Sequence, residues 1–297
     1  MRRGARRSMG GTARLGHAGL ALLAVLGAHC RGGEQRDDGI IAIGGDITEI
    51  VYELGAGDRL MAVDTTSVYP PEALETKPNV GYMRQLSPEG VLSVGGRHVL
   101  ASEGAGPPET IAALQASSLD YVVIPDDPSP EGIVAKVRAV AAALGEQAKG
   151  EELAARVASR LEDLAEKRTR IEGPPVRVLF VLAVRNGRAI VGGEGSSAEA
   201  VIELAGGVNA VTGVVDYRPL GDEALVALAP DAILTMSRTS ERHTLEELDT
   251  LAGIKSTPAM RNGRMYQMDG QRLLGFGSRT PDAASELMDL LYGPISK

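Results

Sequence analysis

The sequence has 297 residues, of which 43% are hydrophobic and 24% are charged, and its formal net charge is −8 at neutral pH. This composition is typical of a globular protein, and the length favours two domains of ordinary size. Residues 1–29 contain five arginines and no acidic residue, so the chain without them would carry −8 − 5 = −13. A body this acidic is a poor candidate for a nucleic-acid-binding protein.

The N-terminus has the pattern of a secretory signal. A basic stretch precedes the apolar run LALLAVLGAH (20–29), which is too short to span a bilayer as a mature helix. Cys30, the only cysteine, follows it. It is either a lipidated new N-terminus, although His29 replaces the small residue usual before such a cysteine, or a residue without a role beside a signal-peptidase site. In both cases we expect an exported protein in the periplasm or cell envelope.

In chain order, the first half alternates short apolar runs with helical stretches. The runs are followed by segments with apolar residues at helical spacing or with prolines at their start, as in DITEIVYELGAG and PPETIAALQAS. This βαβα pattern indicates a mostly parallel sheet covered by helices. The expected strands are 39–45, 60–64, 97–102 and 120–126.

A helical stretch from 129 to about 170 follows, broken near 145–150. A second α/β series then runs to the closing helix TPDAASELMDLLYG. We therefore predict an α/β fold with two Rossmann-like lobes joined by a single long backbone helix, and a ligand cleft between the lobes. The expected divisions are a signal peptide (1–29), a tether (30–38), an N-terminal lobe (39–145), a linking helix (146–173) and a C-terminal lobe (174–297). One helical connection predicts a small change of shape on binding.

Catalytic motifs are missing from this sequence. IAIGGDITEI lacks the full dinucleotide-binding pattern, and there is no Walker loop, H-E-x-x-H or G-x-S-x-G. Without the signal only His98 and His243 remain, which disfavours a histidine cage or triad. His98 is expected to be a surface residue; His243 is either solvated or a ligand from a loop at the cleft mouth. A binding protein is favoured, with a secreted α/β enzyme as the alternative.

The segment NVGYMRQLSPEG (79–90) places Tyr82 two residues before Arg84. A tyrosinate is a hard oxygen donor and a known axial ligand of haem iron. A free phenol ionises only near pH ~10, and a guanidinium on the same side of an extended loop would help it to ionise. Alternatively, Tyr82 packs on the surface and Arg84 pairs elsewhere.

DTTSVYPPEALETKPNVGYMRQLSPEGVLSV and VLASEGAGPPETIAAL resemble the periplasmic haem-binding proteins of bacterial haem ABC importers, and GFGSRTP is similar to a matching segment of that family. The layout resembles class III (cluster A-I) substrate-binding proteins, which also carry cobalamin and ferric siderophores. The resemblance implies a non-enzymatic protein that captures ferric haem and delivers it to an ABC permease and ATPase complex. Cobalamin, a ferric siderophore and another metalloporphyrin stay open as cargo.

By this resemblance Tyr82 is the axial iron ligand, and Arg84 supports it and could neutralise a haem propionate. Arg238 in MSRTS matches a second-lobe arginine near the haem. Leu274 and Phe276 are candidates for an apolar wall of the site, although a core role fits each of them equally well.

Further predictions concern two tyrosines and the acidic residues that would contact the permease. Tyr69 is expected in a turn, with ligand contact as the alternative, and Tyr217 is expected to pack at a helix start. Related importers dock on their permeases through one acidic residue per lobe, which matches Glu109 (or Glu103) and Glu199. Alternatively, these acidic residues stabilise the N-termini of the helices in which they lie.

Overall fold

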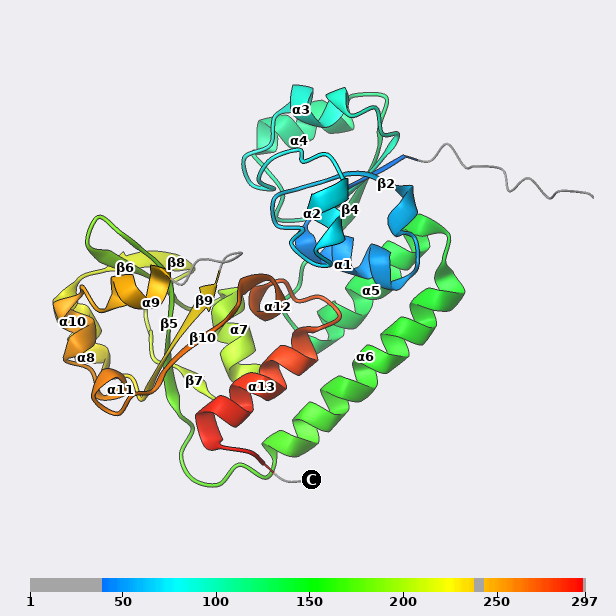
Figure 1. The fold of residues 1–297 in the computed structure, drawn as a ribbon. Helices are drawn as coiled ribbons and strands as arrows, with labels where there is room; N and C mark the ends of the chain where they lie inside the picture. Colours follow the sequence, from blue (N-terminus) through cyan, green and yellow to red (C-terminus); the bar gives the residue numbers. More distant parts are fainter. Residues whose placement is uncertain (1–38, 238–242, 296–297) are drawn as a thin grey trace, which may run out of the picture. The chain divides into compact units, whose positions relative to one another are not determined.

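The computed structural model describes residues 39–237 and 243–295, which lie in one compact unit, residues 38–297 (Figure 1). Cys30, the expected signal and tether, and Arg238 lie outside the described residues. Within the described part of the chain, no helix is both long enough and apolar enough to cross a membrane.

The first lobe is built on a four-stranded sheet with the strand order β2-β1-β3-β4. All three strand pairs are parallel, with Ile40 opposite both Leu60 and His98. Parallel pairing requires crossover connections, and here helices supply them. The elements are β1 (Ile40–Ile43), α1 (Gly45–Glu53), η1 (Gly57–Arg59), β2 (Leu60–Val63), α2 (Glu72–Thr76), α3 (Pro88–Ser93), β3 (His98–Ser102), α4 (Pro108–Gln115) and β4 (Asp120–Ile124).

Two helices, α5 (Pro130–Leu144) and α6 (Gln147–Arg168), join the two sheets in sequence. Ser129 caps α5 by accepting a hydrogen bond from the Gly132 amide, and Gly145 ends it in the left-handed conformation at φ 73°. The break expected near residues 145–150 is therefore a tight turn, after which α6 packs antiparallel against α5 (Figure 1).

The second lobe contains a sheet with the order β10-β9-β5-β6-β8, and β7 pairs with β5. The pairs β10–β9, β9–β5 and β5–β7 are parallel, whereas β6 is antiparallel to both β5 and β8. The elements are β5 (Arg177–Arg185), β6 (Arg188–Gly192), α7 (Ser197–Leu204), β7 (Val208–Asn209), β8 (Tyr217–Leu220), α8 (Asp222–Leu228), β9 (Ala232–Ser237), α9 (His243–Leu248), α10 (Ala252–Lys255), α11 (Pro258–Arg261), β10 (Met265–Asp269), α12 (Gly270–Leu274) and α13 (Thr280–Tyr292).

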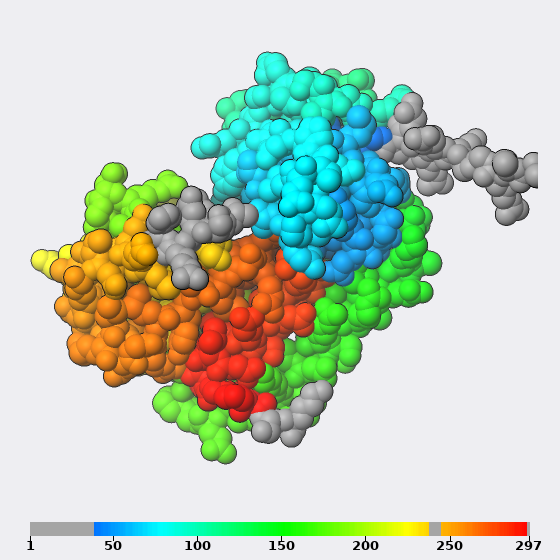
Figure 2. Space-filling model, viewed as in Figure 1, coloured from blue at the N-terminus to red at the C-terminus, as the bar shows by residue number. Residues whose placement is uncertain are grey.

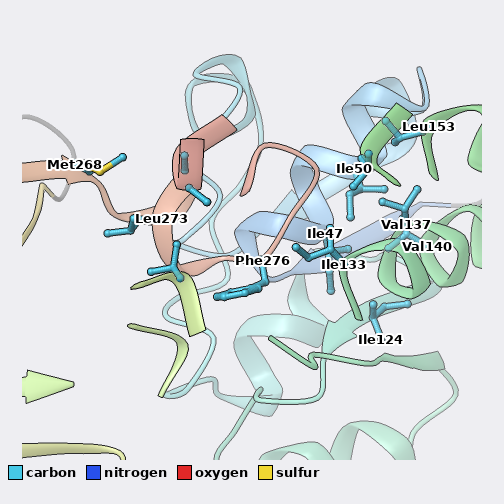
Figure 3. Packing of buried hydrophobic residues seen from close by; sticks show 14 of the residues in the cluster. Ile47, Ile50, Ile124, Ile133, Val137, Val140, Leu153, Met268, Leu273 and Phe276 are labelled. Atoms are coloured by element: carbon cyan, nitrogen blue, oxygen red, sulfur yellow. The ribbon is translucent and has the colours of Figure 1, made fainter. Parts of the chain in front are cut away.

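The largest hydrophobic cluster includes residues of both lobes. Ile47 and Ile50 of α1, Val137 of α5 and Leu153 of α6 belong to it together with Phe276 (Figure 3). Each sheet also carries one smaller hydrophobic cluster on the face opposite the shared cluster. The shared cluster therefore packs the segment after α12 against helices of the first lobe.

The α/β fold class with two sheets and a helical connection is confirmed. One local prediction is wrong: Tyr217 begins the strand β8 rather than a helix. The tight turn at Asp216, with φ 57°, precedes this short strand, and YRPL contains a proline that is tolerated only at a sheet edge.

Candidate functional site

The candidate site begins with the loop that follows β2. The Val80 amide donates to the Val63 carbonyl at 2.9 Å, and the Thr65 amide donates to the Gly81 carbonyl at 2.9 Å. Gly81 has φ 100°, a conformation that favours glycine. These bonds fix the start of the Tyr82 loop at the carboxyl end of β2.

The far side of the same loop contacts the segment EGAGPP (103–108). The Gly106 amide donates to the Met83 carbonyl at 2.9 Å, and the Leu86 amide donates to the Gly106 carbonyl at 3.0 Å. Leu86 is buried, and its carbonyl also accepts from the Thr110 hydroxyl. The two sequence segments that carry the family resemblance are thus hydrogen-bonded partners, and the second one supports the first.

Tyr82 is 43% exposed, and Arg84 is also exposed. The Gln85 amide donates to the Tyr82 carbonyl at 2.7 Å, so residues 82–85 form a turn rather than the expected extended loop. Within the part of the chain that the structure describes, neither side chain has a hydrogen bond or ion pair. A rigid backbone therefore presents an accessible phenol and an accessible guanidinium.

A residue of the second lobe lies within electrostatic range of this loop. Tyr217 packs edge-on against Phe180 with ring centroids 6.3 Å apart, and its hydroxyl lies 2.9 Å from that of Ser197. Burial raises the pKa of Tyr217, while the hydrogen bond with Ser197 and the positive charge of Arg84 oppose that rise. Arg84 therefore lies close enough to Tyr217 to influence its ionisation across the two lobes.

The other expected ligand contacts are placed differently. Phe276 is 1% exposed and belongs to the shared core together with Ile47 and Ile133, so the core role that the sequence left open applies to it (Figure 3). Leu274 is half-buried against the same core. The backbone of His243 begins α9. Its side chain, like the whole of Arg238, lies outside the part of the chain that the structure describes.

The segment GFGSRTP connects the two lobes. Arg279 forms an ion pair with Glu49 of α1 at 2.7 Å, and the Ser278 hydroxyl donates to the same carboxylate at 2.7 Å. The Arg279 guanidinium also lies 3.5 Å from the centroid of the Tyr69 ring. Burial raises the pKa of Glu49 despite these donors. In Figure 2 the surface of α12 and α13 adjoins that of the first lobe at this place.

A second buried ionic cluster lies nearby. The Lys136 ammonium, which is fully buried, donates to Asp46 and Asp126 at 2.5 and 2.7 Å and to the Gly275 carbonyl at 3.1 Å. Burial opposes its charge, but the two carboxylates raise the pKa of Lys136 overall. This cluster was not predictable from the sequence, because a lone lysine in an amphipathic helix is usually a surface residue.

The two expected docking acids differ in their surroundings. Glu109 is exposed in the first turn of α4. Glu199 accepts a hydrogen bond from the Gly195 amide at 2.7 Å, while Ser196 caps α7 by accepting from the Glu199 amide at 3.2 Å. This is a variant of the capping box, so Glu199 also stabilises the helix start.

Neither of two surface cavities, of about 450 and 490 Å³, is lined by Tyr82 or Arg84; both lie along α6. Among the described residues no group of three or more His, Cys, Asp or Glu side chains could hold a metal ion.

Residues 40–272 match the family model described as periplasmic binding protein. The chain belongs to this family. Its members bind solutes and are not enzymes, as the sequence predicted. This periplasmic binding protein superposes on the apo form of the periplasmic haem-binding protein RhuT from Roseiflexus sp. RS-1 with a TM-score of 0.79 and 36% identity, covering 86% of this chain and 98% of RhuT.

Two further relatives are more distant in sequence. An uncharacterised ABC transporter substrate-binding lipoprotein, YvrC of Bacillus subtilis, is 26% identical over 82% of this chain and 77% of its own length. The vitamin B12-binding protein of Vibrio cholerae is 25% identical over 85% of this chain and 88% of its own length. The match to an ABC transporter lipoprotein supports a location in the periplasm or cell envelope.

Proposed function

We propose that this periplasmic binding protein captures ferric haem and delivers it to an ABC permease. The observation that carries the proposal is the accessible Tyr82 on a loop fixed from both sides. The likeness to RhuT, a periplasmic haem-binding protein, supports the same cargo. The vitamin B12-binding relative makes cobalamin the second candidate.

In this proposal the Tyr82 oxygen binds the haem iron as a tyrosinate. Ferric iron is a hard acid and favours an anionic oxygen ligand, and haem sites with an axial tyrosine are known. Arg84 stabilises the anion by its charge and neutralises a propionate. No histidine or carboxylate cage is needed, because the porphyrin supplies the four equatorial ligands.

The delivery partner in the proposal is a permease and ATPase complex of the haem importer class. Glu109 and Glu199 contact it, one from each lobe, and Cys30 carries the lipid anchor. The Arg238 and His243 side chains, which belong to the second lobe, remain candidates for further ligand contact. Leu274, which is half-buried against the shared core, is the candidate apolar contact.

The test is an absorbance titration of residues 31–297 with ferric haem. We compare the wild type with Tyr82→Phe, which removes only the ligating oxygen, and with Tyr69→Phe as the matched control. Tyr69 is 40% exposed, close to the 43% of Tyr82. We expect a saturable Soret shift with high-spin charge-transfer bands that is lost or displaced only in Tyr82→Phe.

Each other result has a definite meaning. Haem binding with an unchanged spectrum in Tyr82→Phe would retain the cargo and contradict the ligand, and His243→Ala would be tested next. Absence of saturable haem binding by the wild type would contradict the proposed function. A parallel titration with cyanocobalamin then decides for the second candidate.

A further inference from the structure

The strands β5, β6 and β8 have one face that is covered by core and one that is only partly covered. Val184, Ala189 and Leu220 point to the second-lobe cluster formed with Leu225 and Ile233. Because side chains alternate along a strand, Ala183, Ile190 and Pro219 point to the opposite face. The pairings Ala183 with Ile190 and Ile190 with Pro219 place these three side by side.

The shared core covers only one end of this second face of the sheet. At one end Phe180 and Tyr217 pack in the shared core. Further along, Ala183 and Ile190 are half-buried and Pro219 is exposed, and among the described residues none of the three belongs to a hydrophobic cluster. A small apolar surface is thus left on the same face as Tyr217.

Two arginines border that surface. Arg185 and Arg188 lie directly opposite each other on either side of the Asn186–Gly187 turn, whose positive φ angles of 51° and 70° match a tight hairpin turn. By alternation both side chains leave the sheet on the face of Ile190. Both are exposed, and neither has an ion pair or hydrogen bond within the described residues.

Like charges directly opposite each other on neighbouring strands are destabilising. No described carboxylate neutralises this pair, so a ligand with carboxylates would relieve the repulsion. Tyr217 of the same face lies within electrostatic range of Arg84 in the Tyr82 loop. The apolar surface and its arginines therefore lie on the sheet face that carries Tyr217.

We propose that Arg185 and Arg188, together with Arg84 of the first lobe, bind the propionate carboxylates of the haem, with Ile190 and Ala183 as the apolar surface under the porphyrin. This inference rests on the proposed function and names the second-lobe half of its site. An apolar plate with two carboxylates at one edge matches a haem in both shape and charge, whereas cobalamin has no free carboxylates to offer the pair.

The experiment measures the Kd of ferric haem and of its dimethyl ester, which lacks the free carboxylates. The variants are R185Q/R188Q and the charge-retaining R185K/R188K. The control R97Q/R156Q removes two exposed arginines elsewhere. We expect R185Q/R188Q to weaken haem binding about tenfold and R97Q/R156Q to change it by less than about twofold. The ester should bind the wild type and R185Q/R188Q equally, and R185K/R188K should recover part of the haem affinity.

Three results would overturn the inference. The first is unchanged haem affinity in R185Q/R188Q. The second is an equal loss for haem and ester, which would indicate altered packing rather than lost carboxylate contacts. If the first or the second result occurs while the wild-type haem spectrum is still lost or displaced in Tyr82→Phe, the proposed function stands and only this inference fails. The third is absence of haem binding by the wild type, which removes both.

Discussion

At the scale of single residues, Lys136 combines complete burial with a full set of partners. Its three hydrogen bonds go to two carboxylates and the Gly275 carbonyl, which satisfy all three donors of an ammonium group. Removing only the lysine would leave Asp46 buried beside Asp126 with no cation. Such an uncompensated charge is costly in a protein interior.

We therefore predict that Lys136→Met lowers the free energy of unfolding by about 3–5 kcal/mol, the range for breaking a buried ion pair. The control is Lys149→Met, since Lys149 is 55% exposed and pairs with Glu146. Its cost should be below about 1 kcal/mol. Urea unfolding followed by circular dichroism measures both, and equal losses would contradict a special role of the Lys136 cluster.

A second residue-scale prediction concerns pH. Burial in β4 raises the pKa of Tyr121 from 10.0 to about 12. Between these values the unfolded chain loses the phenolic proton while the native protein keeps it, so the free energy of unfolding falls as pH rises from about 10 to about 12. Tyr121→Phe should remove part of this fall in urea titrations at several pH values; an identical pH profile would contradict it.

The sequence could predict Tyr82 and Arg84 but not Lys136 or Arg279. The first pair stands in a distinctive loop motif, whereas the partners of Lys136 lie 90 and 10 residues away. The partner of Arg279 lies 230 residues away. Only the tertiary fold brings such partners together. The pairing of the exposed Arg185 and Arg188 could not be predicted from the sequence either, because it depends on the register of the β5–β6 hairpin.

At the scale of elements, α1 is held to the segment before α13 by several polar contacts. Arg279 and Ser278 contact Glu49, and Gln271 of α12 donates to the Gly45 carbonyl at 2.6 Å. Glu49 is only 2% exposed, so its carboxylate depends on these donors. The family-like segment GFGSRTP thus serves the junction between lobes rather than supplying an exposed apolar wall.

Arg279→Ala should lower the free energy of unfolding by about 3 kcal/mol, because it leaves the Glu49 carboxylate buried without its cation. Arg160→Ala is the matched control, since its ion pair with Asp282 is exposed on both sides. That control should cost below about 1 kcal/mol. Thermal and urea unfolding measure both variants, and a loss in Arg279→Ala no larger than in the control would contradict the importance of this junction.

The strands and long helices were predictable because their apolar periodicity is strong, and the observed strands differ from the expected ones by one or two residues at their ends. Strand β8 was not. Its four residues YRPL include a proline and lie half-exposed at the sheet edge, so no alternation is long enough to be recognised.

At the scale of the whole molecule, the proposed docking on a permease requires an acid on each lobe. Glu109 is free for this role, whereas Glu199 also bonds to the Gly195 amide. A charge reversal at Glu199 would therefore disturb the start of α7 as well as the docking. Glu199→Gln keeps an acceptor for that amide and removes only the charge.

We predict that E109Q/E199Q abolishes the stimulation of ATP hydrolysis by the permease complex in proteoliposomes and leaves haem affinity unchanged. The matched control is E89Q/E152Q, which neutralises two exposed acids elsewhere and should keep full stimulation. Retained stimulation in E109Q/E199Q would show that the docking assignment is wrong, and a loss of haem affinity would place these acids in the binding site instead.

The buried polar contacts between the lobes have a consequence for signalling. A carrier whose lobes are joined by the buried Arg279–Glu49 ion pair and by the hydrogen bond from Lys136 to the Gly275 carbonyl has little freedom to close around its cargo. The loaded and empty forms should then give nearly the same small-angle scattering curve. In the proposed delivery to a permease, the distance between the lobes then carries no signal, and we expect the permease to sense the exposed edge of the ligand itself.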